Sequence, residues 1–117
     1  IDEKEYDNST VLLNSDNKSL GKTFLLRVKN NEKILLKGKS LRIGTEKKSV
    51  DYCIRDNCAV SRLHAEILFK NNSYFIIDNN STNHTYINEK EIESKHEMKL
   101  QNKSRIRLAD EEFVFYT

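Results

Sequence analysis

The sequence contains no proline, no tryptophan and only three glycines among its 117 residues. Turns built on Pro-Gly pairs are therefore excluded, and hairpins must rely on Asn and Lys. No apolar run approaches the roughly 18–20 residues of a membrane-spanning helix, so we expect no direct membrane insertion by this chain. The first ten residues, IDEKEYDNST, are acidic and polar and do not resemble a signal peptide.

Neither sign of charge dominates, because 20 Lys and Arg residues against 18 Asp and Glu leave a net charge of +2. A general nucleic-acid binder usually has a clear basic excess, so we expect no nucleic-acid partner and only a local anion site. Four residues separate Cys53 from Cys58, which fits neither a zinc knuckle nor a redox pair. Free thiols favour a cytoplasmic location, or the cytosolic part of a larger or membrane-attached protein.

Residues 1–22 differ in composition from the rest of the chain. They are polar and charged, with one apolar island at Val11-Leu12-Leu13. We interpret 1–22 as a flexible N-terminal lead-in or linker and 23–117 as one folded domain, which we expect to be monomeric. Because the chain begins with Ile rather than Met, we expect it to be a piece of a longer protein.

From residue 23 onward, short segments of alternating polarity follow one another, and no long apolar 3.6 period appears. This spacing predicts an all-β fold, an antiparallel β-sandwich of about eleven strands. Asn-rich turns such as Asn71-Asn72 separate the segments, since Asn tolerates left-handed backbone. The expected strands are 23–29, 33–37, 40–44, 51–54, 64–70, 73–78, 85–88, 91–92, 97–100, 104–108 and 112–116.

The same alternation predicts the hydrophobic core. Each apolar side chain contributes roughly 1.5–3 kcal/mol when fully buried, so about a dozen can offset the ordering of a domain of this size. We expect this core to consist of Leu41, Ile43, Ile67, Phe69, Phe75, Ile77, Ile87, Leu100, Ile106, Leu108, Phe113 and Phe115.

Three loop clusters are rich in hydroxyl, amide or cationic groups: residues 44–49 (GTEKKS), Ser61-Arg62, and residues 79–85 (NNSTNHT). If these clusters meet at one end of the sandwich, they form a small pocket lined with hydrogen-bond donors suited to phosphate oxygens. Ser61 and His64 also suggest a nucleophile and a base, but no oxyanion donor or orienting acid is evident, so we predict no enzyme. The three histidines are widely spaced, so we expect no metal and no other cofactor.

These segments together resemble the forkhead-associated (FHA) domain family, over about residues 23–117. An S-R-x-H motif alone is a weak signal, but here S-T-N-x-T follows it about twenty residues later, between strands of the right kind. The matching residues, in order, are Ile43-Gly44, Asp51-Tyr52, Ile54, Ser61-Arg62-x-His64, Asp78, Ser81-Thr82-Asn83-x-Thr85, Asn88, Ile106-Arg107-Leu108 and Phe113-x-Phe115.

The resemblance implies an FHA/SMAD-like sandwich that binds phosphothreonine peptides through loops at one end. It implies that Ser61 bonds the phosphate, that Arg62 adds charge or contacts the peptide, and that Thr82 lies at the mouth of the phosphate site. Asn83 is expected to hold the peptide main chain. The residues expected to be structural are Gly44, His64, Thr85 and Asn88.

Two positions depart from the family pattern. Thr45 stands where the family usually has an Arg that binds the phosphate. A hydroxyl has neither the charge of a guanidinium nor its paired N–H donors. Lys47 and Lys48 follow closely and can compensate as point charges. His84 replaces a Gly at a turn that is expected to need an unusual backbone angle, and it adds a titratable group beside the site.

We therefore predict a phosphothreonine-peptide-binding module that mediates phosphorylation-dependent protein interaction, in signalling downstream of a Ser/Thr kinase. The alternative is a structural or scaffolding FHA-like domain that binds partners without phosphate, and Thr45 favours this alternative. The Lys-, Asn- and Ile-rich composition is typical of a low-GC genome and favours a bacterial source.

Overall fold

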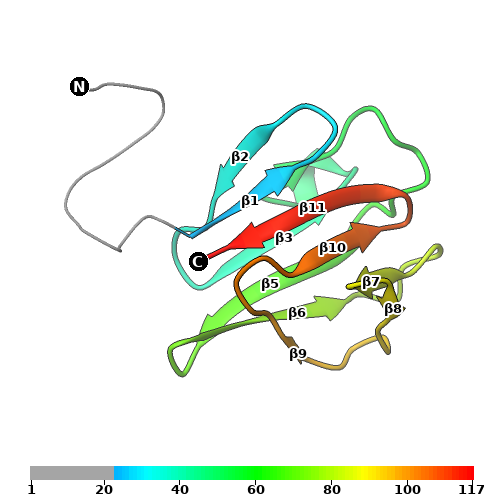
Figure 1. The fold of residues 1–117 in the computed structure, drawn as a ribbon. Coiled ribbons are helices and arrows are strands. Elements are labelled where there is room, and N and C mark those ends of the chain that lie inside the picture. The colour runs from blue at the N-terminus through cyan, green and yellow to red at the C-terminus, as the bar shows by residue number, and fades with distance from the viewer. Residues whose placement is uncertain (1–22) are drawn as a thin grey trace, which may run out of the picture.

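The computed structural model describes residues 23–117 (Figure 1). The predicted lead-in, residues 1–22, lies outside these described residues. Within these described residues, eleven strands and one short 3-10 helix make up the fold. They are β1 (Phe24–Arg27), β2 (Glu32–Leu35), β3 (Ser40–Gly44), η2 (Lys47–Ser49), β4 (Tyr52–Cys53), β5 (Ala65–Lys70), β6 (Ser73–Asp78), β7 (Thr85–Ile87), β8 (Lys90–Glu91), β9 (Met98–Lys99), β10 (Arg105–Leu108) and β11 (Glu111–Tyr116).

The strands form two sheets. A six-stranded sheet has the order β2-β1-β11-β10-β7-β8, and a five-stranded sheet has the order β4-β3-β5-β6-β9. The predicted β-sandwich of about eleven strands is confirmed. One pair departs from antiparallel order, because β4 runs parallel to β3, with Ile43 opposite Tyr52 and Gly44 opposite Cys53. The helix η2, predicted as a loop, closes the short connection between them.

Asparagine forms many of the turns, as the scarcity of glycine requires. Asn31, Asn71, Asn72 and Asn80 all have positive φ angles between 53° and 61°. A short polar side chain lowers the cost of this left-handed geometry, which most L residues avoid. The β5–β6 hairpin is therefore built on two consecutive asparagines rather than on a glycine.

The core lies between the two sheets, and the prediction of which residues form it is wrong for strand β6. Ile76 is completely buried, whereas Phe75 and Ile77 lie on the outer face of β6 and are only partly buried. Strand β6 reads Tyr-Phe-Ile-Ile over four apolar positions, so a period of two cannot select its inner face. The pairing of β6 with β5 determines which face is the inner one, because Ile76 lies opposite the buried Ile67 of β5.

Three other predicted core residues are less buried than expected. Leu41 and Ile87 pack against the core but remain partly buried, and Phe69 is also only partly buried. The core also contains residues that the alternation did not select, which are Leu25, Ile34, Ile54, Val60, Ala65, Ile92 and Ala109. Several of these lie in loops, where no period of two exists to reveal them.

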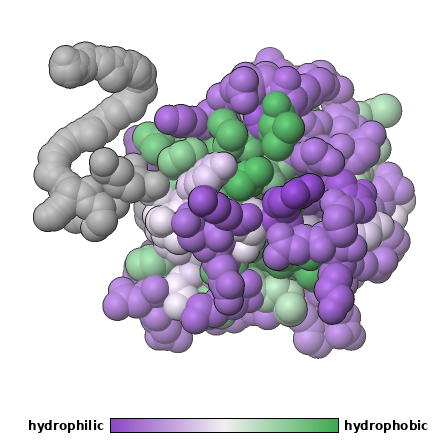
Figure 2. Space-filling view, in the orientation of Figure 1, coloured by the Kyte–Doolittle hydropathy of each residue, from purple (hydrophilic) through white to green (hydrophobic). Residues whose placement is uncertain are grey.

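Most of the face drawn in Figure 2 is hydrophilic, and apolar residues gather in the region of β1 and β2. There the outward side chains include Phe24 and Leu26, which lie opposite Tyr116 and Val114 of β11. Between residues 23 and 117, no helix has the length and hydrophobicity to cross a membrane.

Candidate functional site

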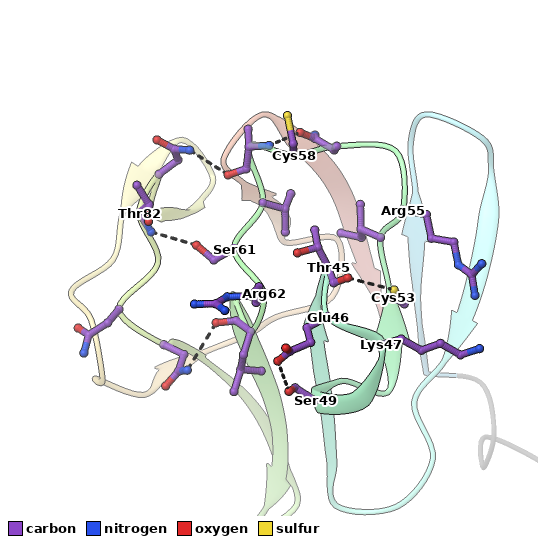
Figure 3. A pocket seen from close by; sticks show the side chains of 18 residues that line it. Thr45, Glu46, Lys47, Ser49, Cys53, Arg55, Cys58, Ser61, Arg62 and Thr82 are labelled. Carbon is purple, nitrogen blue, oxygen red and sulfur yellow. Dashed lines mark hydrogen bonds between the residues drawn. The ribbon is translucent and has the colours of Figure 1, made fainter.

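Three loops meet at one end of the sandwich and enclose a pocket of about 1260 Å3 (Figure 3). Its walls come from the β3–η2 segment, the β4–β5 loop and the β6–β7 loop. The three polar clusters singled out in the sequence are thus brought together. Among the predicted ligand residues, Thr45, Lys47, Ser61, Arg62, Thr82 and Asn83 line the pocket. Lys48 does not line it, although it is exposed on η2.

The Ser61 hydroxyl lies on the pocket wall and faces the β6–β7 loop (Figure 3). Its Oγ accepts a hydrogen bond of 3.1 Å from the Thr82 backbone N–H. A hydroxyl has one donor hydrogen and two lone pairs, so this bond leaves the Ser61 hydrogen available. Ser61 can therefore donate to an anion while Thr82 fixes its oxygen.

His64 connects these loops from below. Its imidazole is completely buried, its Nδ1 accepts from the Ser61 N–H at 3.0 Å, and its Nε2 lies 2.8 Å from the His84 carbonyl oxygen. Because Nδ1 accepts, the ring hydrogen must be on Nε2, which donates to that carbonyl. Burial lowers the pKa of His64, so the ring stays neutral. His64 thus supports the loop carrying Ser61 and does not line the pocket.

Asp78 organises the β6–β7 loop, a role that its sequence context does not predict. Its carboxylate is buried and accepts hydrogen bonds from the Ser81 hydroxyl and N–H, from the Thr85 hydroxyl at 2.6 Å and from the Ser94 hydroxyl at 2.8 Å. Burial alone would raise its pKa, but these donors hold the pKa of Asp78 below its ordinary value. The loop that presents Thr82 and Asn83 is therefore tied to a buried anion. Ser94 comes from a later loop, and no local pattern identifies it.

Gly44 allows the close approach of two backbones under the pocket. A Cβ atom at this position would lie 2.0 Å from the Arg62 carbonyl oxygen and 2.9 Å from that of Ser61. The adjacent amides use this proximity, because Thr45 N–H donates to Ser61 O and Glu46 N–H donates to Arg62 O, both at 3.1 Å. Only a residue without a side chain fits here, which explains Gly before Thr45.

Asn83 and His84 occupy the exposed tip of the β6–β7 loop. Asn83 Nδ2 donates to the Ala59 carbonyl at 2.9 Å and so joins this loop to the β4–β5 loop. His84 has a φ of 69°, the left-handed geometry expected for this position, and its Nδ1 lies 3.3 Å from a Glu91 carboxylate oxygen. The pair with Glu91 points the ring toward β8 rather than leaving it unpartnered.

Positively charged side chains outnumber negatively charged ones around the pocket. Among residues 23–117, three cations line it, Lys47, Arg55 and Arg62, against one carboxylate, Glu46. The Ser49 hydroxyl donates to the Glu46 carboxylate at 2.5 Å. In Figure 3, Arg62 lies beside Ser61, whereas Lys47 lies across the pocket and extends away from Ser61. Arg62 directly follows Ser61 in the chain and lines the same pocket.

A buried arginine of the opposite sheet, Arg27, anchors the β4–β5 loop through Asp56. Arg27 of β1 is 5% exposed, and its guanidinium bonds Glu111 at 2.7 Å and Asp56 at 2.6 Å. The Glu111 hydrogen bond raises the pKa of Arg27 despite the opposing effect of burial. Asn57 donates to Glu111 at 2.9 Å, and its Oδ1 accepts from the Ala59 N–H. The loop before Ser61 is therefore held from both sides, by this network and by Asn83.

The remaining structural positions lie away from the pocket or beneath it. Asn88, with a φ of 50°, ties the end of β7 to β10 by accepting from the Arg105 N–H at 2.9 Å. Thr85 is buried and contacts Asp78. No group of three His, Cys, Asp or Glu side chains suited to a metal ion occurs within residues 23–117.

Known structures with this architecture include phosphopeptide-binding proteins. EmbR of Mycobacterium tuberculosis in complex with a low-affinity phosphopeptide is 29% identical, with a TM-score of 0.74 over 80% of this chain and 24% of that chain. An FHA domain studied for phosphothreonine-dependent interactions is 26% identical, with a TM-score of 0.72 over 81% of this chain and 95% of that one. The FHA domain of CT664 from Chlamydia trachomatis is 23% identical (TM-score 0.72, 81% and 96% covered) and shows the fold alone.

None of the curated proteins compared with the chain matches it. The sequence profile of the FHA domain matches residues 38–109, which include all three pocket loops. Because this match covers more than half of the chain, the protein belongs to the FHA domain family.

Proposed function

We propose that this domain binds phosphothreonine-containing segments of a partner protein, and that a Ser/Thr kinase creates its ligand. It would thereby recruit the longer protein that contains it in a signalling pathway of the cytoplasm. The observation that carries the proposal is the Ser61 hydroxyl, whose oxygen accepts the Thr82 N–H and which lines one pocket together with Thr82 and Arg62. A hydroxyl donor, an exposed guanidinium and a second hydroxyl are the groups that bind phosphate oxygens.

The relatives support this proposal. EmbR binds a phosphopeptide, and the 26% identical FHA domain is described by its phosphothreonine-dependent interactions. The FhaA FHA domain, also 26% identical, is complexed with the intracellular domain of Rv3910, which is a protein partner. The proposed roles are donation to the phosphate by Ser61, charge from Arg62, and contact with the peptide main chain by Asn83.

Arg62 is proposed to take the place of the arginine that Thr45 replaces. The Arg62 backbone is fixed, because its carbonyl accepts from the Glu46 N–H at 3.1 Å. Its side chain is exposed beside Ser61 (Figure 3), so it can reach an oxygen of the same phosphate. Lys47 extends away from Ser61, so it is a weaker candidate for this role than the sequence suggested.

One observation favours a phosphate-independent scaffold instead. Both Thr45 and the carboxylate of Glu46 line the pocket, and neither adds the positive charge that a phosphate needs. In this alternative the same loops would bind an unmodified surface of a partner protein. The two functions differ in whether binding requires the phosphate.

Fluorescence anisotropy with degenerate peptide pools separates the two functions. The pools are centred on phosphothreonine, phosphoserine or unmodified threonine, and the proteins are wild type, Ser61→Ala, Asn83→Ala and Ser40→Ala. Ser40→Ala is the matched control, because Ser40 is exposed at the start of β3 and does not line the pocket. We expect only the phosphothreonine pool to bind. Loss of a charge-assisted bond at Ser61 costs about tenfold or more in affinity.

Equal binding of phosphorylated and unmodified pools by the folded wild type would support the scaffold. Unchanged affinity of Ser61→Ala for the phosphothreonine pool would reject the proposed phosphate site.

A further inference from the structure

We propose that the wall of the pocket opposite Thr82 is a second anion subsite, formed by Arg55 and Lys47. It would bind an acidic side chain or a second phosphorylated residue of the peptide that carries the phosphothreonine. This inference rests on the proposed function and deepens it, because it names the class of peptide that the site selects.

The size of the pocket leaves room for such a subsite. Its volume of about 1260 Å3 exceeds the roughly 300–1,000 Å3 of sites that take whole small molecules. One phosphothreonine at Ser61 therefore fills only part of it. The pocket continues past Thr45 to Cys53 and Arg55, so flanking residues of a peptide would lie along this second wall.

The backbone of Arg55 is fixed while its side chain is exposed. On one side, Ile54 is completely buried and donates its N–H to the Gly44 carbonyl at 2.7 Å. On the other side, the Asp56 carboxylate is paired with Arg27 at 2.6 Å and with Lys29 at 3.0 Å. Arg55 thus stands between two anchored neighbours, and little ordering of the loop is needed when an anion binds.

Lys47 is presented in a similar way. It begins η2, whose turn is closed by the Ser49 N–H donating to the Glu46 carbonyl at 2.9 Å. Figure 3 shows Lys47 and Arg55 on the far side of the pocket from Thr82, with both charged ends at the outer rim of the pocket. Two cations on one wall attract a negative group of a bound chain.

The described residues leave both side chains without an acidic partner. Across residues 23–117, no carboxylate lies within ion-pair distance of Arg55 or Lys47, whereas Arg27, Arg42 and Arg107 each have such a partner. Glu46, the acidic residue that lines the pocket in the described part of the chain, already accepts the Ser49 hydroxyl. A guanidinium favours bidentate contact with carboxylate or phosphate, and an ammonium adds a point charge.

Anisotropy with four phosphothreonine peptide pools tests the subsite. The flanking positions hold only neutral residues in the first pool, one added Glu in the second, one added phosphoserine in the third and one added Lys in the fourth. An unphosphorylated neutral pool shows whether the domain reads phosphothreonine at all. The proteins are wild type, Arg55→Gln, Lys47→Gln and, as matched control, Lys48→Gln, because Lys48 is an exposed neighbour that does not line the pocket.

We expect the Glu pool to bind about two- to fivefold more tightly than the neutral pool, as one or two exposed ion pairs allow. The phosphoserine pool is expected to bind more tightly still, and the Lys pool more weakly. Arg55→Gln should remove this preference without weakening the neutral phosphothreonine pool. Lys47→Gln should reduce the preference, and Lys48→Gln should keep it. High salt should reduce the preference in wild type.

Equal binding of the neutral, Glu and phosphoserine pools by wild type would overturn the subsite and leave the proposed function standing. An equal loss of preference in Lys48→Gln would also overturn it, since general surface charge would then be the cause. If the neutral phosphothreonine pool binds no better than its unphosphorylated form, the proposed function fails and the subsite fails with it.

Discussion

Replacing Gly44 by Ala tests how the pocket is held together. The new Cβ would lie 2.0 Å from the Arg62 carbonyl oxygen and 2.6 Å from its carbonyl carbon, and both are backbone atoms that cannot rotate away. Overpacking of this kind costs about 1–3 kcal/mol. The separation also lengthens the bonds from Thr45 N–H and Glu46 N–H to the Ser61–Arg62 segment, at about 1 kcal/mol each.

The free energy of unfolding should therefore fall by about 3–5 kcal/mol in Gly44→Ala. For a domain of this size that corresponds to a drop in Tm of at least about 12 °C. Urea denaturation followed by tyrosine fluorescence or circular dichroism measures the change. Because Ser61 moves with its backbone, phosphothreonine-peptide affinity should fall by more than tenfold even in conditions where the variant is folded.

Gly38→Ala is the matched control. Gly38 has a φ of +73°, but no atom lies within 4 Å of the position of its Cβ. Its cost is left-handed backbone alone, about 1–2 kcal/mol, and it should leave peptide binding unchanged. A Gly44→Ala variant that is no less stable than Gly38→Ala and binds peptide like wild type would refute a backbone clash at Gly44.

Three further predictions follow from the site. The lowered folded pKa of His64 makes the unfolded chain bind the proton more readily, so we expect wild type to lose stability on acidification from about pH 6.5. His64→Gln should reduce this loss in pH-dependent urea titrations, and an unchanged pH slope would contradict the prediction. Asp78→Asn should lower the free energy of unfolding by about 3 kcal/mol at pH 7. The difference from wild type should be smaller below about pH 4, because the stabilisation by the carboxylate is lost as pH falls toward its lowered folded pKa. A difference that does not depend on pH would contradict this prediction. Thr45→Arg should tighten phosphothreonine-peptide binding by about ten- to a hundredfold in calorimetry. Thr45→Val is the uncharged control, and equal effects of the two substitutions would show that no phosphate lies beside residue 45.

Most strands were predictable from the sequence because their alternation and the turn residues agree. Strands β3 and β6 have the predicted bounds, residues 40–44 and 73–78. The inner face of β6 was not predictable, since four consecutive apolar residues make both faces equally suitable. The parallel pairing of β4 with β3 was also missed, because the two-residue strand Tyr52–Cys53 has no pattern that reveals its direction.

The candidate site was predictable where one loop carries its own motif. Ser61, Thr82 and Asn83 stand in such motifs, and the structure places all three in the pocket. The supporting contacts were not predictable, because they join segments far apart in the chain. Ser94 reaches Asp78 across 16 residues and Glu111 reaches Arg27 across 84, and no local spacing encodes either contact.

The most direct measurement follows the Thr82 backbone amide by NMR while a phosphothreonine peptide is added. This N–H donates to the Ser61 oxygen at 3.1 Å, so a phosphate that engages the Ser61 hydroxyl must change its environment. We predict that the Thr82 and Ser61 amide signals shift strongly with the phosphothreonine peptide, and stay in place with the unphosphorylated peptide of the same sequence. Identical shifts with both peptides, or none with either, would show that the pocket does not read phosphothreonine.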